Sequence, residues 1–248
     1  MKKMLKFLLI SIISLILIEL NSCVIETLDD PGKPITFNIE TTDFNSLEIK
    51  NIFDIVLIQD SGNYITFGCY ANQRNNISVA NQNGLLSLQQ NIQPSMLGNY
   101  KHVRAYIHFK NINTINLGDC VTLENSGIIN QSILEINDGS ELSEINLNVN
   151  LENLTISNNS DNLGYYIFSG KSTNVSINMN GSSIIKAIGL ESDFCNIEQG
   201  SIGDCYVYVL QKLNVKFLTQ GNVFLKGNAE ILVDPNYLQK KVQVVSEN

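Results

Sequence analysis

Apolar positions recur along the second half of the chain with a nearly constant step. Between residues 115 and 217, an apolar residue precedes a short polar turn in each of six segments, and successive segments are 20 or 21 residues apart. Three or four residues later comes Gly or Asn, followed by a small polar residue. A fixed step of this size indicates a repeat architecture. We call the six apolar positions the anchors: Ile115, Ile136, Ile156, Ile177, Ile197 and Phe217.

Polar and apolar residues alternate around the anchors. Leu134 and Ile136 are two residues apart and therefore share one face of an extended strand, while Glu135 lies on the other face. The same alternation directs Thr155 and Ser176 outward in the next two copies. A period of two indicates strands rather than helices. The Gly or Asn that follows each strand predicts a turn with a positive φ.

A step near 20 residues, built from strands without a helical segment, predicts one coil of a parallel β-helix. The coils of such a solenoid stack about 4.8 Å apart, so equivalent residues meet and form a continuous apolar core. The leucine-rich repeat has a similar step, but its L-x-x-L-x-L-x-x-N pattern is absent, and a β-propeller needs a longer step. The predicted fold is therefore all-β, a single-stranded parallel β-helix with about 20 residues per coil.

Composition divides the chain into four parts, which we predict to be a signal peptide over 1–22, a tether over 23–34, the β-helix domain over 35–235 and a C-terminal tail over 236–248. The signal peptide has a basic start, and its apolar run is too short to span a membrane. The tether is acidic and contains proline, so it has little to bury. The tail follows Pro235, which breaks strand pairing, and it either adds a closing strand or frays.

The signal peptide ends in Leu20-Asn21-Ser22, followed by Cys23. This order resembles a bacterial lipobox, in which an aliphatic residue and a small residue precede a cysteine. The resemblance implies cleavage before Cys23 and lipidation of that cysteine, which would anchor the protein to a membrane. The expected location is the cell envelope, as an outer-membrane lipoprotein on the periplasmic or the exposed side. An ordinary signal peptide that happens to carry a cysteine is the alternative.

Residues 35–90 are rich in strand-forming residues but lack the 20-residue step. We expect them to form an irregular β-rich cap, because a solenoid otherwise exposes the edge of its first coil. Within this segment, Asn83 and Gly84 separate two apolar runs and predict a hairpin. In the strand that follows the cap, alternation directs His102 and His108 outward. Six residues of strand separate them by about 20 Å, so they cannot share a metal ion.

The charge balance excludes one class of partner. The net charge is −8, with 16 Lys and Arg against 24 Asp and Glu, so we expect no basic face for nucleic acid. Charged residues make up only 16% of the chain, and asparagine supplies much of the remaining polar surface. We ascribe the asparagines to turns and side-chain ladders along the stack. The sequence implies no cofactor and leaves the oligomeric state open.

Four cysteines remain after the lipobox. An exported chain can pair them as disulfides. Cys195 and Cys205, however, fall in predicted inward columns, where a cysteine packs as a small apolar residue. The chain has no C-x-x-C motif, so zinc and redox roles lack support. Disulfide formation is left open for Cys69, Cys120, Cys195 and Cys205.

Two classes of function remain: a non-catalytic binding or structural role, and a carbohydrate-active enzyme that acts on acidic polysaccharide. Solenoid enzymes of the second class need clustered carboxylates with Arg or Lys on one outward strand face. Here the outward repeat positions hold Asn, Ser, Thr and Lys, and Arg74 and Arg104 are the chain's two arginines. We therefore predict no catalytic residue. Asp138 beside Gly139 could contribute to a Ca²⁺ site, but Asp-Gly is ordinary turn chemistry, and we predict no metal.

Three stretches carry a resemblance to a known family: "NIFDIVLIQDSGNYITFGCYANQRNNISVANQNGLLSLQQ", the serial Gly-Ser turns, and "GSIGDCYVYVLQKLNVKFLTQGNVFLKGNAEI". They resemble the head GIN domain family over about residues 37–234. Its members are cell-envelope proteins of Gram-negative bacteria, described as heads of auto-transporter adhesins. The resemblance implies a right-handed β-helix, no catalytic residues, and adhesion to a glycan or a protein. Asn159 departs from the family's turn glycine.

Overall fold

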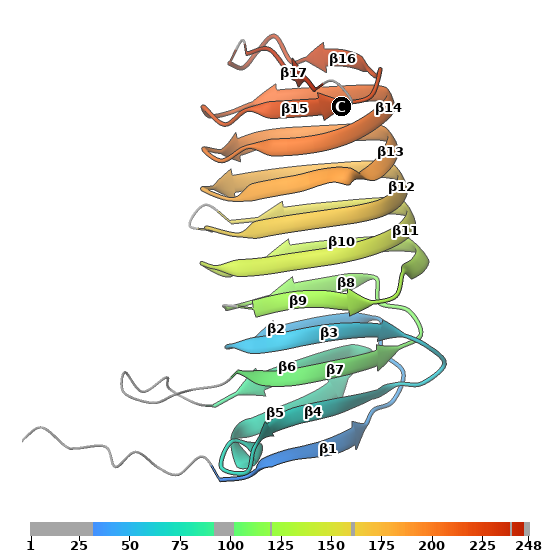
Figure 1. Cartoon of the computed structure of the whole chain (residues 1–248), viewed down its shortest axis with the longest axis vertical. Helices are drawn as coiled ribbons and strands as arrows, with labels where there is room; N and C mark the ends of the chain where they lie inside the picture. The colour runs from blue at the N-terminus through green and yellow to red at the C-terminus, as the bar shows by residue number, and fades with distance from the viewer. Residues whose placement is uncertain (1–31, 92–101, 120, 160–161, 239, 246–248) are drawn as a thin grey trace, which may run out of the picture.

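A computed structural model describes residues 32–91, 102–119, 121–159, 162–238 and 240–245. These residues form a column of stacked β-coils (Figure 1). The helical content of the described residues is one 3-10 turn, η1 (Arg74–Asn76). Strand pairing is antiparallel only at the N-terminal end of the column and parallel elsewhere. The predicted all-β β-helix is therefore confirmed.

Short strands build the two ends of the column, and strands of up to 18 residues build its middle. The strands are β1 (Pro34–Glu40), β2 (Ser46–Lys50), β3 (Phe53–Gln59), β4 (Tyr64–Tyr70), β5 (Ile77–Gln82), β6 (Leu85–Gln90), β7 (Val103–Phe109), β8 (Thr114–Leu117), β9 (Val121–Ser126), β10 (Ile129–Asp138), β11 (Ser143–Asn158), β12 (Tyr165–Gly181), β13 (Ile184–Ser201), β14 (Cys205–Phe217), β15 (Val223–Lys226), β16 (Glu230–Val233) and β17 (Gln243–Val244).

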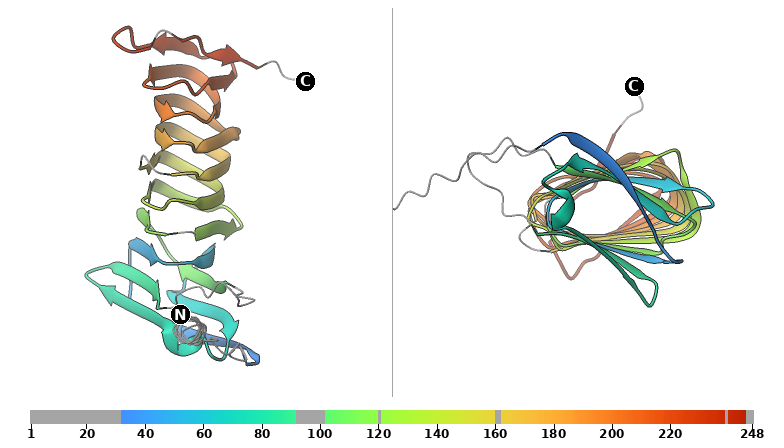
Figure 2. Two further views of the ribbon diagram at one scale, coloured as in Figure 1. Left: turned by 90° about the vertical axis from the view of Figure 1, so that its left-hand side faces the viewer. Right: turned by 90° about the horizontal axis from the view of Figure 1, so that it is seen from below.

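The column has two broad sides and looks like a flattened tube when viewed along its axis (Figure 2). Each long strand crosses from one side to the other. The first part of β14 pairs with β15, for example, and its last part pairs with β16. We call the side that contains the anchors the anchor face, and the side that contains β3, β7, β9 and β15 the opposite face.

The anchors stack as neighbours in the interior. The first five anchors pair with one another from coil to coil, and all five are at most 2% exposed. Thr155 and Ser176, which precede two of them, point outward as predicted. The apolar column that fills this side of the core is Ile115, Ile136, Ile156, Ile177 and Ile197.

The last step of the repeat differs from the prediction. Ile197 pairs with Val215, which is 18 residues further on, whereas Phe217 pairs with Gln199. This coil is two residues shorter than the coil before it because the pairing register shifts twice. Residues 188–190 of β13 have no partner on β14, which shortens the step by three residues, and one extra residue on β14 further along lengthens it by one. Both Val215 and Phe217 point inward, so the shift of two residues keeps the predicted side and changes only the neighbour.

The N-terminal segment forms both the predicted cap and one complete coil of the stack. Its antiparallel pairs, β1 with β4, β4 with β7 and β5 with β6, confirm an irregular end. The predicted hairpin is present, with positive φ at Asn83 and Gly84. Yet β2 lies between β6 and β8, and β3 lies between β7 and β9, so they form a full coil of the stack. Leu47 pairs with Leu86 and Ile115 and continues the anchor column.

The turn glycines are required mainly for space rather than for a positive φ. Of the predicted turn positions that the structure describes, only Gly181 has a positive φ, at 67°. A Cβ added to Gly200 would lie 2.9 Å from the carbonyl oxygen of Met179 and 2.6 Å from Oδ1 of Asn180. The preceding coil approaches this turn too closely for any side chain, which corrects the predicted reason for the glycine.

Replacing Gly200 with valine is expected to lower the free energy of unfolding by about 1–3 kcal/mol, the usual cost of overpacking a close contact. A Cβ at Gly68 would have no atom within 4 Å, so Gly68→Val is the matched control. Its effect is expected to stay within about 0.5 kcal/mol. Urea melts of the two variants check this difference, and equal stabilities would argue against the close approach at Gly200.

The C-terminal end closes with a short strand. Gln243 and Val244 of β17 pair with Phe224 and Leu225 of β15. Of the two possibilities for the tail, a closing strand is therefore present at these two residues.

Candidate functional site

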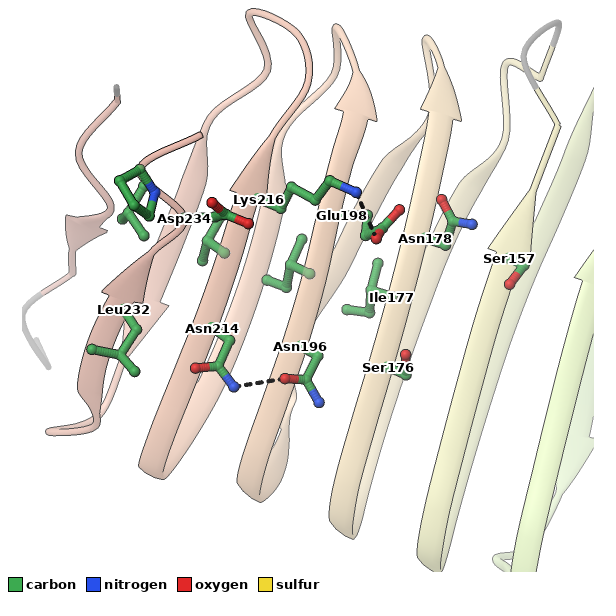
Figure 3. A pocket seen from close by; sticks show the side chains of 14 residues that line it. Ser157, Ser176, Ile177, Asn178, Asn196, Glu198, Asn214, Lys216, Leu232 and Asp234 are labelled. Carbon is green, nitrogen blue, oxygen red and sulfur yellow. Dashed lines mark hydrogen bonds and ion pairs between the residues drawn. The ribbon is translucent and has the colours of Figure 1, made fainter. Parts of the chain in front are cut away.

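A shallow groove of about 750 Å³ runs across the outer surface of the anchor face near the C-terminal end of the column. Strands β11 to β14 form its floor, and β16 with the loop that follows forms one wall. Figure 3 shows its side chains projecting from successive strands into a common space. The groove therefore lies at outward positions of the repeat, which the sequence predicted to be polar.

Two outward columns line the groove, one on each side of the anchor column. The first is Ser176, Asn196, Asn214 and Leu232, which are paired neighbours on β12, β13, β14 and β16. The second is Ser157, Asn178, Glu198, Lys216 and Asp234.

The first column offers amide groups in a row. Asn214 Nδ2 donates a hydrogen bond of 2.7 Å to Oδ1 of Asn196. This bond uses one polar atom of each amide. The other two, Oδ1 of Asn214 and Nδ2 of Asn196, have no protein partner among the described residues. The column thus presents an acceptor and a donor to a ligand in neighbouring coils, about 4.8 Å apart.

The second column contains a charge cluster. Lys216 Nζ lies 3.0 Å from Oε1 of Glu198 and 4.5 Å from the ring centroid of Tyr237. The hydrogen bond to Glu198 raises the pKa of Lys216, which keeps the lysine charged. Asp234 follows Lys216 in the column, on the side away from Glu198 (Figure 3). The repeat does not predict this cluster, because a constant 20-residue step aligns Lys216 with Asn196 instead of Glu198.

The two histidines occupy separate places on the opposite face. His102 Nδ1 lies 3.0 Å from Asp54, and His108 Nδ1 lies 2.6 Å from Asp60. His108 also stacks on Tyr64 with ring centroids 3.9 Å apart. The hydrogen bond from His108 lowers the pKa of Asp60. Each histidine thus pairs with its own aspartate on β3 or just beyond it, and the structure does not bring the two imidazoles together.

Asp138 occupies the interior rather than a surface turn. Its carboxylate is 2% exposed and accepts hydrogen bonds from Ser140, Ser143, Asn162 and Tyr166. Burial raises the pKa of Tyr166 far above its usual value, and the negative charge of Asp138 adds to the effect. Because both carboxylate oxygens accept hydrogen bonds from the protein, the role of Asp138 is to stabilise the corner of the stack. Among the described residues, no group of three or more His, Cys, Asp or Glu can hold a metal ion.

The cysteines that the structure describes are free thiols. Cys195 and Cys205 are at most 1% exposed, and Cys69 is 7% exposed. Burial raises the pKa of the Cys195 thiol to about 12, so it is not a reactive group. The predicted packing role of Cys195 and Cys205 is confirmed. Cys23 and Cys120 lie outside the described residues.

Comparisons with known proteins agree with this architecture. A family model described as "Putative auto-transporter adhesin, head GIN domain" matches residues 43–229. No curated protein matches the chain. A "putative adhesin" from Bacteroides fragilis is similar in structure, with a TM-score of 0.73, 16% identity, and coverage of 86% of this chain and 95% of its own.

Two further solved structures are similar. A "putative adhesin" from Parabacteroides merdae has a TM-score of 0.65 at 16% identity, and covers 87% of this chain and 97% of its own. A "putative lipid binding protein" from Parabacteroides distasonis has a TM-score of 0.60 at 20% identity, and the match covers 87% of this chain and 98% of that protein. At these identities the likeness shows the fold. Because the family model covers more than half of the sequence, this chain belongs to the family described as "Putative auto-transporter adhesin, head GIN domain".

Proposed function

We propose that this protein is a non-catalytic, glycan-binding protein of the cell envelope. The observation that carries the proposal is the groove on the anchor face, where amide groups of Asn196 and Asn214 project side by side with unused donors and acceptors. Sugars present many hydroxyl groups, and a row of fixed amide and hydroxyl partners recognises them through hydrogen bonds. The spacing of the coils suits an extended chain that lies across several strands.

Family membership supports a binding role, since the family and two similar structures are described as adhesins. The third similar structure is described as lipid binding, which makes a lipid the main competing ligand. The lining of this groove favours a sugar. Its outward side chains include Ser157, Ser176 and Asn178, which offer hydrogen-bond partners, while Leu232 and Pro235 add an apolar wall.

An enzyme acting on acidic polysaccharide is the second candidate. The observation in its favour is that Glu198 and Asp234 flank Lys216 in one outward column. Lys216 forms a 3.0 Å ion pair with Glu198 and lies over the ring of Tyr237. These contacts are typical of an ion pair that stabilises neighbouring coils. We therefore favour binding without catalysis.

One experiment separates these candidates. The purified protein is applied to an array of glycans, lipids and proteins, and the same protein is incubated with acidic polysaccharides while new chain ends are counted. We expect retention of glycans and no increase in chain ends. Depolymerisation would establish the enzyme instead, and exclusive retention of lipids would contradict the glycan assignment.

We further propose that Cys23 carries a lipid anchor and places the protein at the outer membrane, on its periplasmic or exposed side. The lipobox-like sequence before Cys23 supports this location. Within the part of the chain that the structure describes, no helix is long and apolar enough to span a membrane.

Replacing Cys23 with alanine is expected to abolish metabolic labelling with a fatty-acid analogue, because the thiol that receives the lipid is lost. The variant should also leave the membrane fraction. Cys69→Ala is the control, since this thiol is buried and its loss should leave labelling unchanged. A Cys23→Ala variant that still incorporates the label would contradict the anchor.

A further inference from the structure

The groove on the anchor face has an apolar end. In its first outward column, Leu232 follows Asn214 and is 43% exposed. The members of the column in the preceding coils are Ser176, Asn196 and Asn214. Pro235 lies in the loop after β16 and is exposed as well. The column therefore changes from polar to apolar within one coil, a step of about 4.8 Å, and a ligand that lies along the amide groups also meets this apolar surface.

The unused polar atoms of the amide row face its two ends. The hydrogen bond from Asn214 to Asn196 leaves Oδ1 of Asn214 on the side of Leu232, and Nδ2 of Asn196 on the side of Ser176 (Figure 3). The carbonyl oxygen of an asparagine side chain accepts hydrogen bonds and cannot donate them. The group that binds Oδ1 of Asn214 must therefore be a donor that lies beside an apolar side chain.

An acetamido group provides such a donor. A secondary amide is flat and trans, so its N–H and the methyl group on its carbonyl carbon lie along the same edge. With the N–H on Oδ1 of Asn214, the methyl group is directed to the apolar end of the groove and can cover Leu232. A hydroxyl group also donates, but it leaves Leu232 in contact with water. An ammonium group would bring a charge against this apolar side chain, which costs free energy.

The second outward column limits the charge of the ligand. Glu198 and Asp234 are carboxylates, and Lys216 is the cation among the lining residues, so two negative charges and one positive charge give a net charge of −1. Lys216 already pairs with Glu198 at 3.0 Å and lies over the ring of Tyr237. On a chain whose net charge is −8, this lining repels a sugar that carries carboxylate or sulfate groups. A neutral acetamido sugar avoids this repulsion.

We propose that the groove takes glycans whose sugars carry N-acetyl groups. This inference rests on the proposed function, which assigns a glycan to the groove, and adds the chemical group that is recognised. The acetamido N–H donates to Oδ1 of Asn214 and the methyl group packs on Leu232. Further along the same glycan, a carbonyl or hydroxyl oxygen accepts from Nδ2 of Asn196. A site that combines a hydrogen bond with an apolar contact discriminates against sugars that lack either partner.

Calorimetric titration with three oligosaccharides of equal length and linkage tests the proposal. They are oligomers of N-acetylglucosamine, glucose and glucosamine, which differ in one substituent per sugar: acetamido, hydroxyl or amino. We expect the N-acetylglucosamine oligomer to bind at least about tenfold more tightly than the glucose oligomer, the usual effect of one well-placed apolar group. Its affinity should not change with salt, because the ligand is neutral.

Leu232→Ser tests the apolar contact. Because Leu232 is exposed, this variant should fold normally, bind the N-acetylglucosamine oligomer several-fold more weakly and bind the glucose oligomer as before. Leu210→Ser is the matched control, since Leu210 is 41% exposed and does not line the groove. The control should keep the preference of the unchanged protein for the N-acetylated oligomer.

Four outcomes would overturn the inference. Equal affinity of the unchanged protein for the N-acetylglucosamine and glucose oligomers would leave the groove as a glycan site without this preference. Tightest binding of the glucosamine oligomer would assign a cationic sugar to the carboxylates instead. An unchanged preference in Leu232→Ser would remove the role of the apolar end. No binding of any of the three oligomers would also overturn it, and retention of other glycans on the array described above would then show that the proposed function itself stands.

Discussion

Replacing Ile156 with aspartate is expected to prevent the protein from folding. Ile156 is 1% exposed and lies between Ile136 and Ile177 in the anchor column. A carboxylate there would be buried without a partner, which costs more than a domain of this size can offset. Because each coil stacks on both neighbours, the damage extends along the column. Circular dichroism and denaturant melts of the purified variant measure the result.

Thr155→Asp is the matched control for this prediction. Thr155 precedes Ile156 on the same strand but points outward, beside Glu135 and Ser176. A new carboxylate at this surface, even next to Glu135, is expected to cost under about 1 kcal/mol. If Thr155→Asp were the more damaging change, the strand would be shifted by one residue and every side chain in it would face the other way.

Replacing Asp138 with alanine is expected to destabilise the protein by more than about 3 kcal/mol, because several buried donors lose their acceptor and each unsatisfied donor costs about 1–3 kcal/mol. The donors come from three places in the chain: Ser140 and Ser143, then Asn162, then Tyr166. They join the coil that ends at β10 to the next coil, so their loss loosens the corner of the stack. Thermal melts measure the change.

Two further variants make this prediction sharper. Asp138→Asn keeps the shape but turns an amide N–H₂ group toward donors such as Asn162 Nδ2, so it should also destabilise, though less than alanine. Asp43→Ala removes an aspartate that is 83% exposed, and its ion pair with Lys110 should be worth at most about 1 kcal/mol. A melting temperature of Asp138→Ala equal to that of Asp43→Ala would contradict the buried network.

The regular part of the fold can be predicted from the sequence because it depends on two simple patterns, the alternation of polar and apolar residues and the constant step between coils. Alternation places Ile136 and Ile156 inward from a few neighbours on each side, and the constant step then makes them stacked neighbours. The outward, polar character of Asn196 and Asn214 follows from the same alternation, so the surface that forms the groove could be predicted as polar.

Other features depend on contacts between distant segments, which alternation cannot reveal. Leu47 belongs to the anchor column, but the chain passes through β4 to β7 before it returns to Ile115, so no fixed step connects them. Likewise, Lys216 meets Glu198 only because one coil is two residues short. The interior position of Asp138 depends on donors 24 and 28 residues away, Asn162 and Tyr166, and Asp-Gly at a turn gave no sign of it.

The central claim is that the groove on the anchor face binds a glycan through its ladder of amide groups. The most direct test compares three forms of the protein on one glycan array: the unchanged chain, the groove variant Asn196→Ala, Asn214→Ala, and a control variant Asn130→Ala, Asn150→Ala. The control removes an equivalent ladder, in which Asn150 donates a 3.0 Å hydrogen bond to Asn130 outside the groove. We expect the unchanged chain and the control to retain the same neutral glycans and the groove variant to lose them. Equal retention by all three forms, or no retention of any glycan by the unchanged chain, would contradict the claim.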